Sequence, residues 1–277
     1  LIATKALFTS TLVKNSAKDH ELKIILLFSI LLLAMVRYAL VIDCYQPWGL
    51  VLWKWSRVVA RSNIIFDFGG VLLDWDPRYL YRDYFNDDAK MEKFLAEVCT
   101  SEWNAQMDAG KPFAQGVQEL TEKHPEWTKE IEMYHTQWSK MLKSEHADGV
   151  GLLKKVLADG RFKVFGLTNW SAETFPYAFS HYRFLDDFEG IVVSGEEHMN
   201  KPDKRIYYTL LERYHLKASS CVFIDDNPAN VEMANKVGIK GILWQHNPEE
   251  VFEQILAALN EPDVVEDEEV PHNHEYN

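Results

Sequence analysis

From Asn63 onward the chain alternates short apolar runs, rich in β-branched or aromatic residues, with longer segments of helical periodicity. The apolar runs, which we predict as strands, cover residues 64–68, 162–167, 191–194, 221–224 and 241–243. Helical segments cover residues 147–160, 203–215 and 228–238, the second opened by Pro202 and the third closed by Gly238. Strands that alternate with helices imply a parallel sheet covered on both faces. We therefore predict a doubly wound α/β fold.

Polar residues follow three of the predicted strands at their carboxyl ends. Asp67 ends the first strand, Thr168 and Asn169 follow the second, and Asp225 with Asp226 follow the fourth. Doubly wound sheets bind their ligands at the carboxyl ends of the strands. We expect these side chains to gather into one site.

A long insertion separates the first two strands, at about residues 76–145. It reads as helices over residues 77–85, 88–98, 113–124 and 126–142, which is too much structure for a loop. We predict a helical cap at 76–145 over a core formed by 62–75 and 146–260. Its candidate substrate contacts are Arg78, Trp103, Asp108 and Lys111. The alternative for Trp103 is that it only packs helices together.

The two ends of the chain differ in character from its body. Residues 24–42 are almost continuously apolar, so the extension at 1–61 is either a membrane anchor or a segment that does not belong to the mature protein. Residues 261–277 carry seven acidic residues and no Lys or Arg, which predicts a disordered tail.

Composition limits the partners and the compartment. The net charge of −13 argues against a nucleic-acid duplex as partner, because binding to phosphates requires a basic surface. Three cysteines without metal-ligand spacing are too few for a disulfide framework. We expect a cytoplasmic protein, membrane-attached only if residues 24–42 are an anchor, whose oligomeric state the sequence leaves open.

Four short motifs stand in a fixed order at the predicted strand ends and helix starts. They are FDFGGVL with Asp67, FGLTNWS with Thr168, MNKPDKRIY with Lys201, and VFIDDNPANVEMANKVG with Asp225 and Asp226. Together they resemble the haloacid dehalogenase-like (HAD) hydrolase superfamily over about residues 63–260. The likeness is greatest to the bacterial branch that includes α-D-glucose-1-phosphate phosphatase. It implies a Rossmann-like core with a helical cap and a small phosphorylated substrate, such as a sugar phosphate.

The resemblance also implies roles for individual residues. Asp67 would attack phosphorus and form an aspartyl-phosphate, which water then hydrolyses. Thr168 would donate a hydrogen bond to the phosphoryl group, with Asn169 beside it. Lys201 would neutralise a phosphoryl oxygen and could also hold Asp67 ionised.

Repulsion between a carboxylate nucleophile and a phosphate requires a cation between them. Hard oxygen ligands suited to Mg²⁺ are offered by Asp67, the Gly69 carbonyl, Asp225 and Asp226. Asp226 is the favoured direct ligand, while Asp225 binds directly or through water. The alternative is that the segment Asp226-Asn227-Pro228 only caps the following helix.

Gly69 departs from the pattern of most phosphatases of the superfamily, which carry a second Asp at this position as general acid and base. General acid–base catalysis typically increases the reaction rate by about 10²–10⁴-fold. In a phosphatase another group or the substrate itself would have to handle the proton, and His198, Asn169 and Asp108 are the candidate groups. A dehalogenase would need none, because a halide leaves without a proton, but such enzymes use no metal and generally lack the acidic pair. A phosphate- or partner-binding module without catalysis is the third possibility.

Overall fold

The computed structural model describes residues 63–260. The predictions for residues 1–61, including the apolar segment at 24–42, and for the tail at 261–277 lie outside the described residues. No helix between residues 63 and 260 combines the length and the apolar character needed to cross a bilayer.

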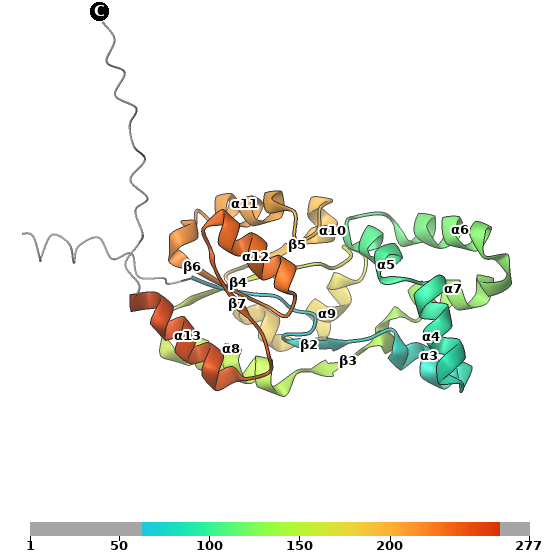
Figure 1. The fold of residues 1–277 in the computed structure, drawn as a ribbon, viewed down its shortest axis with the longest axis horizontal. Helices are drawn as coiled ribbons and strands as arrows, with labels where there is room; N and C mark the ends of the chain where they lie inside the picture. Colours follow the sequence, from blue (N-terminus) through green and yellow to red (C-terminus); the bar gives the residue numbers. More distant parts are fainter. Residues whose placement is uncertain (1–62, 261–277) are drawn as a thin grey trace, which may run out of the picture. The chain divides into compact units, whose positions relative to one another are not determined.

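The core is a five-stranded sheet in the order β5-β4-β1-β6-β7, in which every neighbouring pair is parallel (Figure 1). Its strands are β1 (Asn63–Phe66), β4 (Lys163–Thr168), β5 (Gly190–Val193), β6 (Cys221–Asp225) and β7 (Lys240–Leu243). The chain passes from β1 to β4 on one side and later reaches β6 on the other side of β1. The order therefore reverses around β1, which creates the crevice where such sheets bind ligands.

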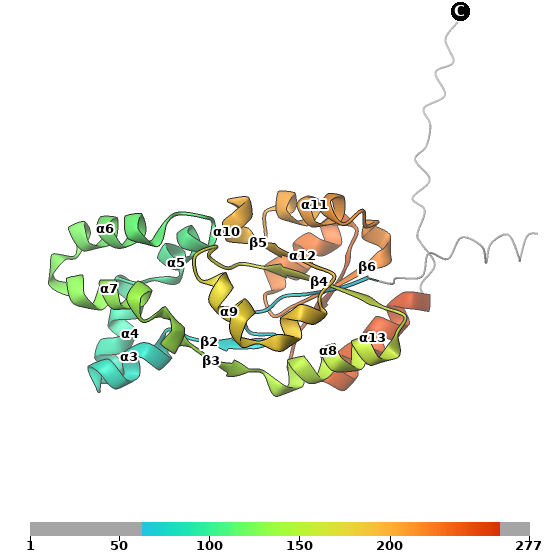
Figure 2. The same ribbon diagram turned by 180° about the vertical axis from the view of Figure 1, so that it is seen from behind.

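Helices cover both faces of this sheet (Figures 1 and 2). They are α8 (Ala147–Asp159), α9 (Phe175–His181), α10 (Ser194–Glu197), α11 (Lys204–Arg213), α12 (Pro228–Val237) and α13 (Pro248–Asn260). Alternate residues of β1 enter different cores: Ile64 and Phe66 pack in the cluster that contains α8 and α13, and Ile65 packs in the cluster with α11 and α12. Every β1 residue is buried because a parallel strand has no face toward water.

The helical insertion, which we define as α3 to α7, lies between two short strands that pair antiparallel, β2 (Leu73–Trp75) and β3 (Leu142–Glu145). Its helices are α3 (Arg78–Phe85), α4 (Asp88–Glu97), α5 (Ser101–Asp108), α6 (Phe113–Lys123) and α7 (Thr128–Thr136). They gather beyond the β2–β3 ribbon, beside the end of the sheet (Figures 1 and 2). The buried aromatic cluster of Tyr81, Phe94 and Tyr134 gives the insertion its own interior.

The structure confirms the predicted fold class and adds three local corrections. The β2–β3 ribbon was not predicted, since strands of three and four residues carry no detectable period and the partners are far apart in sequence. Helix α5 was also missed, although its N-cap Thr100 accepts a hydrogen bond from the Trp103 amide. Pro202 does not open α11, because Asp203 is its N-cap and accepts from the Arg205 amide.

Candidate active site

The polar residues predicted at the strand ends meet at one edge of the sheet. Phe66 is in register with Gly166 of β4 and with Ile224 of β6, so the residues that follow reach the same level. The Asp67 amide continues the ladder by donating to the Ile224 carbonyl at 2.9 Å. Asp67, Thr168 and Asp225 are all buried there.

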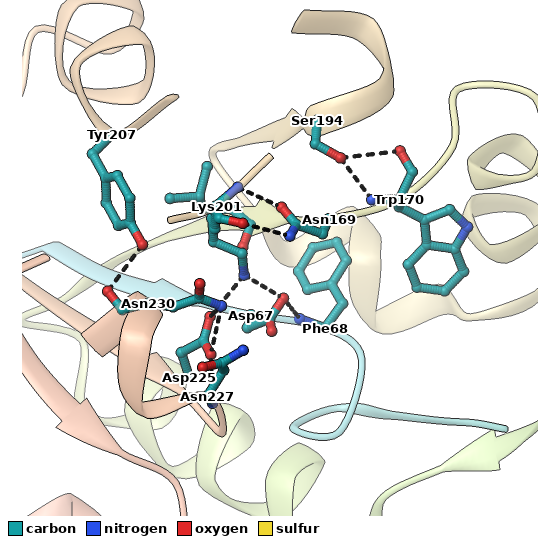
Figure 3. Close-up of polar contacts among 11 residues, drawn as sticks. Asp67, Phe68, Asn169, Trp170, Ser194, Lys201, Tyr207, Asp225, Asn227 and Asn230 are labelled. Carbon is teal, nitrogen blue, oxygen red and sulfur yellow. Dashed lines mark hydrogen bonds and ion pairs between the residues drawn. The ribbon is translucent and has the colours of Figure 1, made fainter. Parts of the chain in front are cut away.

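Lys201 joins two of these carboxylates from the loop before α11 (Figure 3). Its Nζ lies 2.8 Å from Asp67 Oδ1 and 2.7 Å from Asp225 Oδ2, and it donates to the Leu167 carbonyl at 2.8 Å. These three contacts use all three ammonium hydrogens. Lys201 is therefore fully engaged by the protein.

The Lys201 backbone is fixed by Asn169. The Lys201 amide donates to Asn169 Oδ1 at 2.8 Å, and Asn169 Nδ2 donates back to the Lys201 carbonyl at 3.0 Å (Figure 3). The polar residue after β4 thus positions the lysine that contacts Asp67.

Negative charge exceeds positive charge in this buried site. Burial raises the pKa of Asp67 to about 8, against the effect of Lys201 and with additional repulsion from Asp225 and Asp226. Burial opposes the charged form of Lys201, but Asp225 and Asp67 raise its pKa above the ordinary value. A further cation beside Asp67 would favour its ionised form.

Asp225 is held by donors on several sides. In addition to Lys201, it accepts from the Asn227 amide at 2.8 Å and from Asn230 Nδ2 at 3.1 Å. Asn227 also caps α12, where its side chain accepts from the Ala229 amide. The helix cap is therefore Asn227, and capping does not occupy the two acids before it.

Three carboxylates fit a hard cation. Asp67, Asp225 and Asp226 each offer an oxygen, and these atoms lie within 4.8 Å of one another. Gly70 has φ +74°, and a Cβ there would lie 2.2 Å from Asp226 Oδ2. The glycine lets the chain turn while Asp226 approaches its backbone closely, and the all-oxygen donor set suits Mg²⁺.

Thr168 supplies a polar group with no partner. It is fully buried, and its Oγ1 has no hydrogen-bond partner among the described residues. Buried hydroxyl groups are normally satisfied, so an orphaned one beside the carboxylates is suited to an oxygen-rich ligand.

A cavity of about 90 Å³ lies beside these groups. It is lined by Gly69, Trp75, Asn104, Asp108, Trp138, Asn169, Trp170 and Thr174. Apart from its two neighbours in the chain, no residue between 63 and 260 has an atom within 4 Å of the position that a Cβ on Gly69 would take. The insertion and the core both contribute to the walls, whose largest side chains are the three tryptophans.

Comparison with known proteins agrees with this arrangement. The family model described as haloacid dehalogenase-like hydrolase matches residues 64–244, which is most of the described chain. This chain belongs to the haloacid dehalogenase-like hydrolase family. The finer likeness to α-D-glucose-1-phosphate phosphatases remains a prediction.

Two fungal proteins are similar to this HAD hydrolase in sequence. The sesquiterpene phosphatase astK of Aspergillus oryzae is 30% identical over 183 residues, which cover 64% of this chain and 87% of the relative. The drimenol cyclase drtB of Aspergillus calidoustus is 30% identical over 103 residues, 37% of this chain. That match spans only 19% of the cyclase.

Solved structures of HAD proteins share the fold. The magnesium complex of a HAD family enzyme from Bacteroides thetaiotaomicron has a TM-score of 0.54 at 21% identity, covering 68% of this chain and 95% of that chain. A predicted HAD-like family hydrolase from Porphyromonas gingivalis has a TM-score of 0.53 at 20% identity. The match covers 72% of this chain and 98% of that chain.

Within this HAD hydrolase, the four residues predicted as substrate contacts in the insertion lie in different places. Asp108 lines the 90 Å³ cavity and also a larger one of about 430 Å³. Arg78 lines only the larger cavity and is paired with Glu92, with its Nε 2.6 Å from Oε1.

Trp103 and Lys111 do not line either cavity. Trp103 is buried inside the insertion, where its indole N–H donates to the Gly116 carbonyl at 3.2 Å. Lys111 pairs with Glu119 at 2.7 Å. The structure does not bring these two to the site, because Trp103 on α5 and Lys111 in the loop after it both contact α6 instead.

Three tryptophans of the HAD site were not predicted. Trp75, Trp138 and Trp170 line the smaller cavity, and the Trp75 indole N–H has no partner among the described residues. Trp170 lies two positions after β4, and Trp75 ends the short strand β2 that follows the Asp67 motif; this closeness to the motifs is the one signal that could have identified them. Trp138 comes from the far end of the insertion and had none.

Proposed function

We propose that this chain is a Mg²⁺-dependent phosphomonoester hydrolase that acts through an aspartyl-phosphate on Asp67. The convergence of Asp67, Asp225 and Asp226 on one point carries the proposal. A dehalogenase needs no such cluster, because it expels a halide without a metal. Two comparisons lend support: one relative is a sesquiterpene phosphatase, and the Bacteroides HAD enzyme has been solved with magnesium and inorganic phosphate.

In the proposed reaction Asp67 is the nucleophile. Its Oδ1 is oriented by Lys201 Nζ at 2.8 Å and by the Phe68 amide at 2.7 Å. The other carboxylate oxygen, Oδ2, is left to attack phosphorus in line with the departing ester oxygen. Because all three Lys201 donors are engaged, the geometry favours the role of Lys201 in holding Asp67 over direct contact with the phosphate.

The remaining polar groups would bind the phosphoryl oxygens and the cation. The Thr168 hydroxyl would donate to a phosphoryl oxygen and so find the partner that it lacks. Asp67, Asp226 and the Gly69 carbonyl would hold Mg²⁺, with Asp225 as a further ligand directly or through water. The bound ion would supply positive charge against the phosphate and favour the ionised form of Asp67.

The organic part of the substrate would lie against the tryptophans. Trp75, Trp138 and Trp170 offer apolar faces, while Asn104 and Asn169 offer hydrogen bonds. Such a wall fits the C–H face of a sugar, and it also fits an isoprenyl chain, the type of group handled by a sesquiterpene phosphatase. The larger cavity, which shares Trp75, Asn104 and Asp108, would take the more distant part of the substrate.

We also propose that residues 76–145 work as a cap over a core formed by 62–75 and 146–260. The β2–β3 ribbon is the connection at which the cap would open to admit substrate and close to exclude water.

Phosphate release by the full 277-residue chain tests the function. The panel is glucose 1-phosphate, farnesyl monophosphate and 4-nitrophenyl phosphate, each with Mg²⁺ or with EDTA. We expect release that requires Mg²⁺ and is lost in Asp67→Asn, but not in Asp83→Asn, an exposed carboxylate on α3. Chloride release from 2-chloropropionate without metal would instead identify a dehalogenase. Phosphate binding that survives Asp67→Asn, without turnover of any ester, would identify a binding module.

A further inference from the structure

The missing side chain at position 69 leaves room that belongs to the substrate cavity. Gly69 lines the 90 Å³ cavity, and among the described residues, its two chain neighbours aside, no atom lies within 4 Å of where its Cβ would be. A carboxylate placed there could serve the ester oxygen that leaves phosphorus. With glycine at this position, a side chain that gives a proton to that oxygen would reach it from another wall of the same cavity.

Asp108 is the one ionisable side chain among the described residues that line this cavity. Of the other two candidates, Asn169 uses both ends of its amide on the Lys201 backbone. His198 is exposed and packs against Gly110, where a Cβ would lie 2.1 Å from its Nδ1. The walls of the cavity therefore leave Asp108 alone as a group that can exchange a proton.

Contacts to the core hold Asp108 in place, although it belongs to the insertion. Its carboxylate accepts from Asn104 Nδ2, on the same helix, at 2.8 Å, and the backbone amide of Ser171 in the core acts to lower its pKa. Its carbonyl accepts from the Ser194 hydroxyl at 2.5 Å. One turn earlier, the Ala105 carbonyl accepts from Asn200 Nδ2 at 2.7 Å. The last turn of α5 is thus attached to the core beside the site.

The environment of Asp108 favours proton exchange near neutral pH. Burial raises the pKa of Asp108 to about 7, although the Ser171 amide acts in the opposite direction. From α7 the ionisable neighbour is Tyr134, and across the larger cavity lie Arg78, Glu92 and Cys99. Arg78 and Glu92 are paired with each other, and the core side presents only Asn169, Trp170 and Thr174. Among the described residues, no unpaired charged side chain faces Asp108 and stabilises one of its protonation states over the other.

We propose that Asp108 is the general acid and base of this hydrolase, supplied by the insertion in place of the carboxylate that Gly69 lacks. This inference rests on the proposed phosphatase function. In the first step Asp67 forms its bond to phosphorus, the phosphorus–ester oxygen bond breaks, and the Asp108 proton goes to the ester oxygen, which leaves as an alcohol. In the second step water gives a proton to Asp108, its oxygen bonds to phosphorus, and the bond to Asp67 breaks. Inorganic phosphate, free Asp67 and protonated Asp108 result.

The test compares two kinds of leaving group in the full chain with Mg²⁺. An alkyl phosphate, whichever of glucose 1-phosphate and farnesyl monophosphate turns over faster, needs a proton at its leaving oxygen. 4-Nitrophenyl phosphate releases a stable phenolate and does not. The variants are Asp108→Asn, the double variant Asp108→Asn with Gly69→Asp, and Glu102→Gln as an exposed carboxylate on the same helix.

In Asp108→Asn we expect kcat/KM for the alkyl ester to fall by about 10²–10⁴-fold. For 4-nitrophenyl phosphate, kcat/KM should stay within about 10-fold, while kcat falls and one equivalent of phenolate appears as a burst, because only the second step then needs Asp108. In the double variant, kcat/KM for the alkyl ester should be at least about 10-fold higher than in Asp108→Asn. In Glu102→Gln, kcat/KM should equal that of the wild type.

An equal fall in kcat/KM for both esters, without a burst, would assign Asp108 a structural role and overturn the inference. Unchanged kinetics in Asp108→Asn would overturn it as well. A wild-type chain that releases phosphate from no ester would refute the phosphatase function itself, and the inference with it. Thermal unfolding of each variant separates misfolding from a loss of chemistry.

Discussion

The Lys201 ammonium lies 2.8 Å from Asp67 Oδ1, although 134 positions separate the two residues in the chain. The same nitrogen lies 2.7 Å from Asp225 Oδ2. The lysine side chain is 1% exposed, and those of Asp67 and Asp225 are 11% and 0% exposed. One cation thus links two neighbouring strands of the sheet through their terminal carboxylates.

Replacing Lys201 by Met should destabilise the fold strongly. Two buried carboxylates would lose their common partner, and breaking a buried ion pair in this way costs about 3–5 kcal/mol in the free energy of unfolding. Urea unfolding measures the change, and Lys204→Met, at an exposed position of α11, should lie within about 0.5 kcal/mol of the wild type. A loss below about 1 kcal/mol for Lys201→Met would mean that the pair contributes little.

Thr168→Val should separate stability from activity. The Thr168 hydroxyl has no partner among the described residues, so removing it should change the free energy of unfolding by less than about 1 kcal/mol. If it binds the phosphoryl group, kcat/KM should fall by about 10²–10³-fold. Thr121→Val is the matched control, because Thr121 Oγ1 on α6 also has no hydrogen-bond partner among residues 63–260 and Thr121 lines neither cavity. Normal activity in Thr168→Val would contradict its proposed role.

Asp226→Asn should weaken Mg²⁺ binding by at least about 10-fold. The measurement is the increase in melting temperature with Mg²⁺ concentration, which requires no substrate. Saturation at 100 times the dissociation constant corresponds to about 2.7 kcal/mol of stabilisation in the wild type. Glu232→Gln on α12 removes an equally negative, exposed charge and controls for net charge. Equal Mg²⁺ dependence in both variants would exclude Asp226 as a ligand.

Gly70 and Gly69 should respond differently to the same substitution. Gly70→Ala forces an alanine to φ +74° and brings its Cβ to 2.2 Å from Asp226 Oδ2, so we expect a loss of at least about 1–3 kcal/mol. At position 69 the added Cβ would enter open space, and the backbone φ lies outside the left-handed region. Gly69→Ala should therefore lower the free energy of unfolding by less than about 1 kcal/mol. Chemical denaturation of the two variants checks the difference, which equal costs would refute.

The stability of the protein should depend on pH through Asp108. The pKa of Asp108 is raised from 3.8 to about 7, so the folded state retains a proton that the unfolded state has lost. The stability that the folded state gains by keeping this proton is fully present below about pH 4 and is lost as the pH rises to about 7. Asp108→Asn removes the effect, and its stability relative to the wild type should rise by up to about 3 kcal/mol between pH 5 and pH 8. Asp83→Asn, which is exposed, should show no such change, and parallel curves for wild type and Asp108→Asn would contradict the prediction.

The sequence by itself determined the sheet and the contents of its functional edge. Runs such as residues 221–224 are too short and too apolar for anything but buried strands, and alternation with helices makes those strands parallel. Parallel strands end at one edge, so the acids and Thr168 that follow them had to meet. These features depend on local periodicity and on the handed, short-range connections of the fold, both of which a single sequence displays.

Only the tertiary structure decided which residues of the insertion face that edge. Trp103, Asp108 and Lys111 lie within nine positions of one another, yet Asp108 alone reaches the cavity. The choice depends on how the last turn of α5 docks against Ser194 and Asn200, residues about 90 positions away. Helical periodicity predicts which side chains share one face of a helix. Which part of the protein packs against that face depends on contacts between residues far apart in the chain, and these leave no local signal in the sequence.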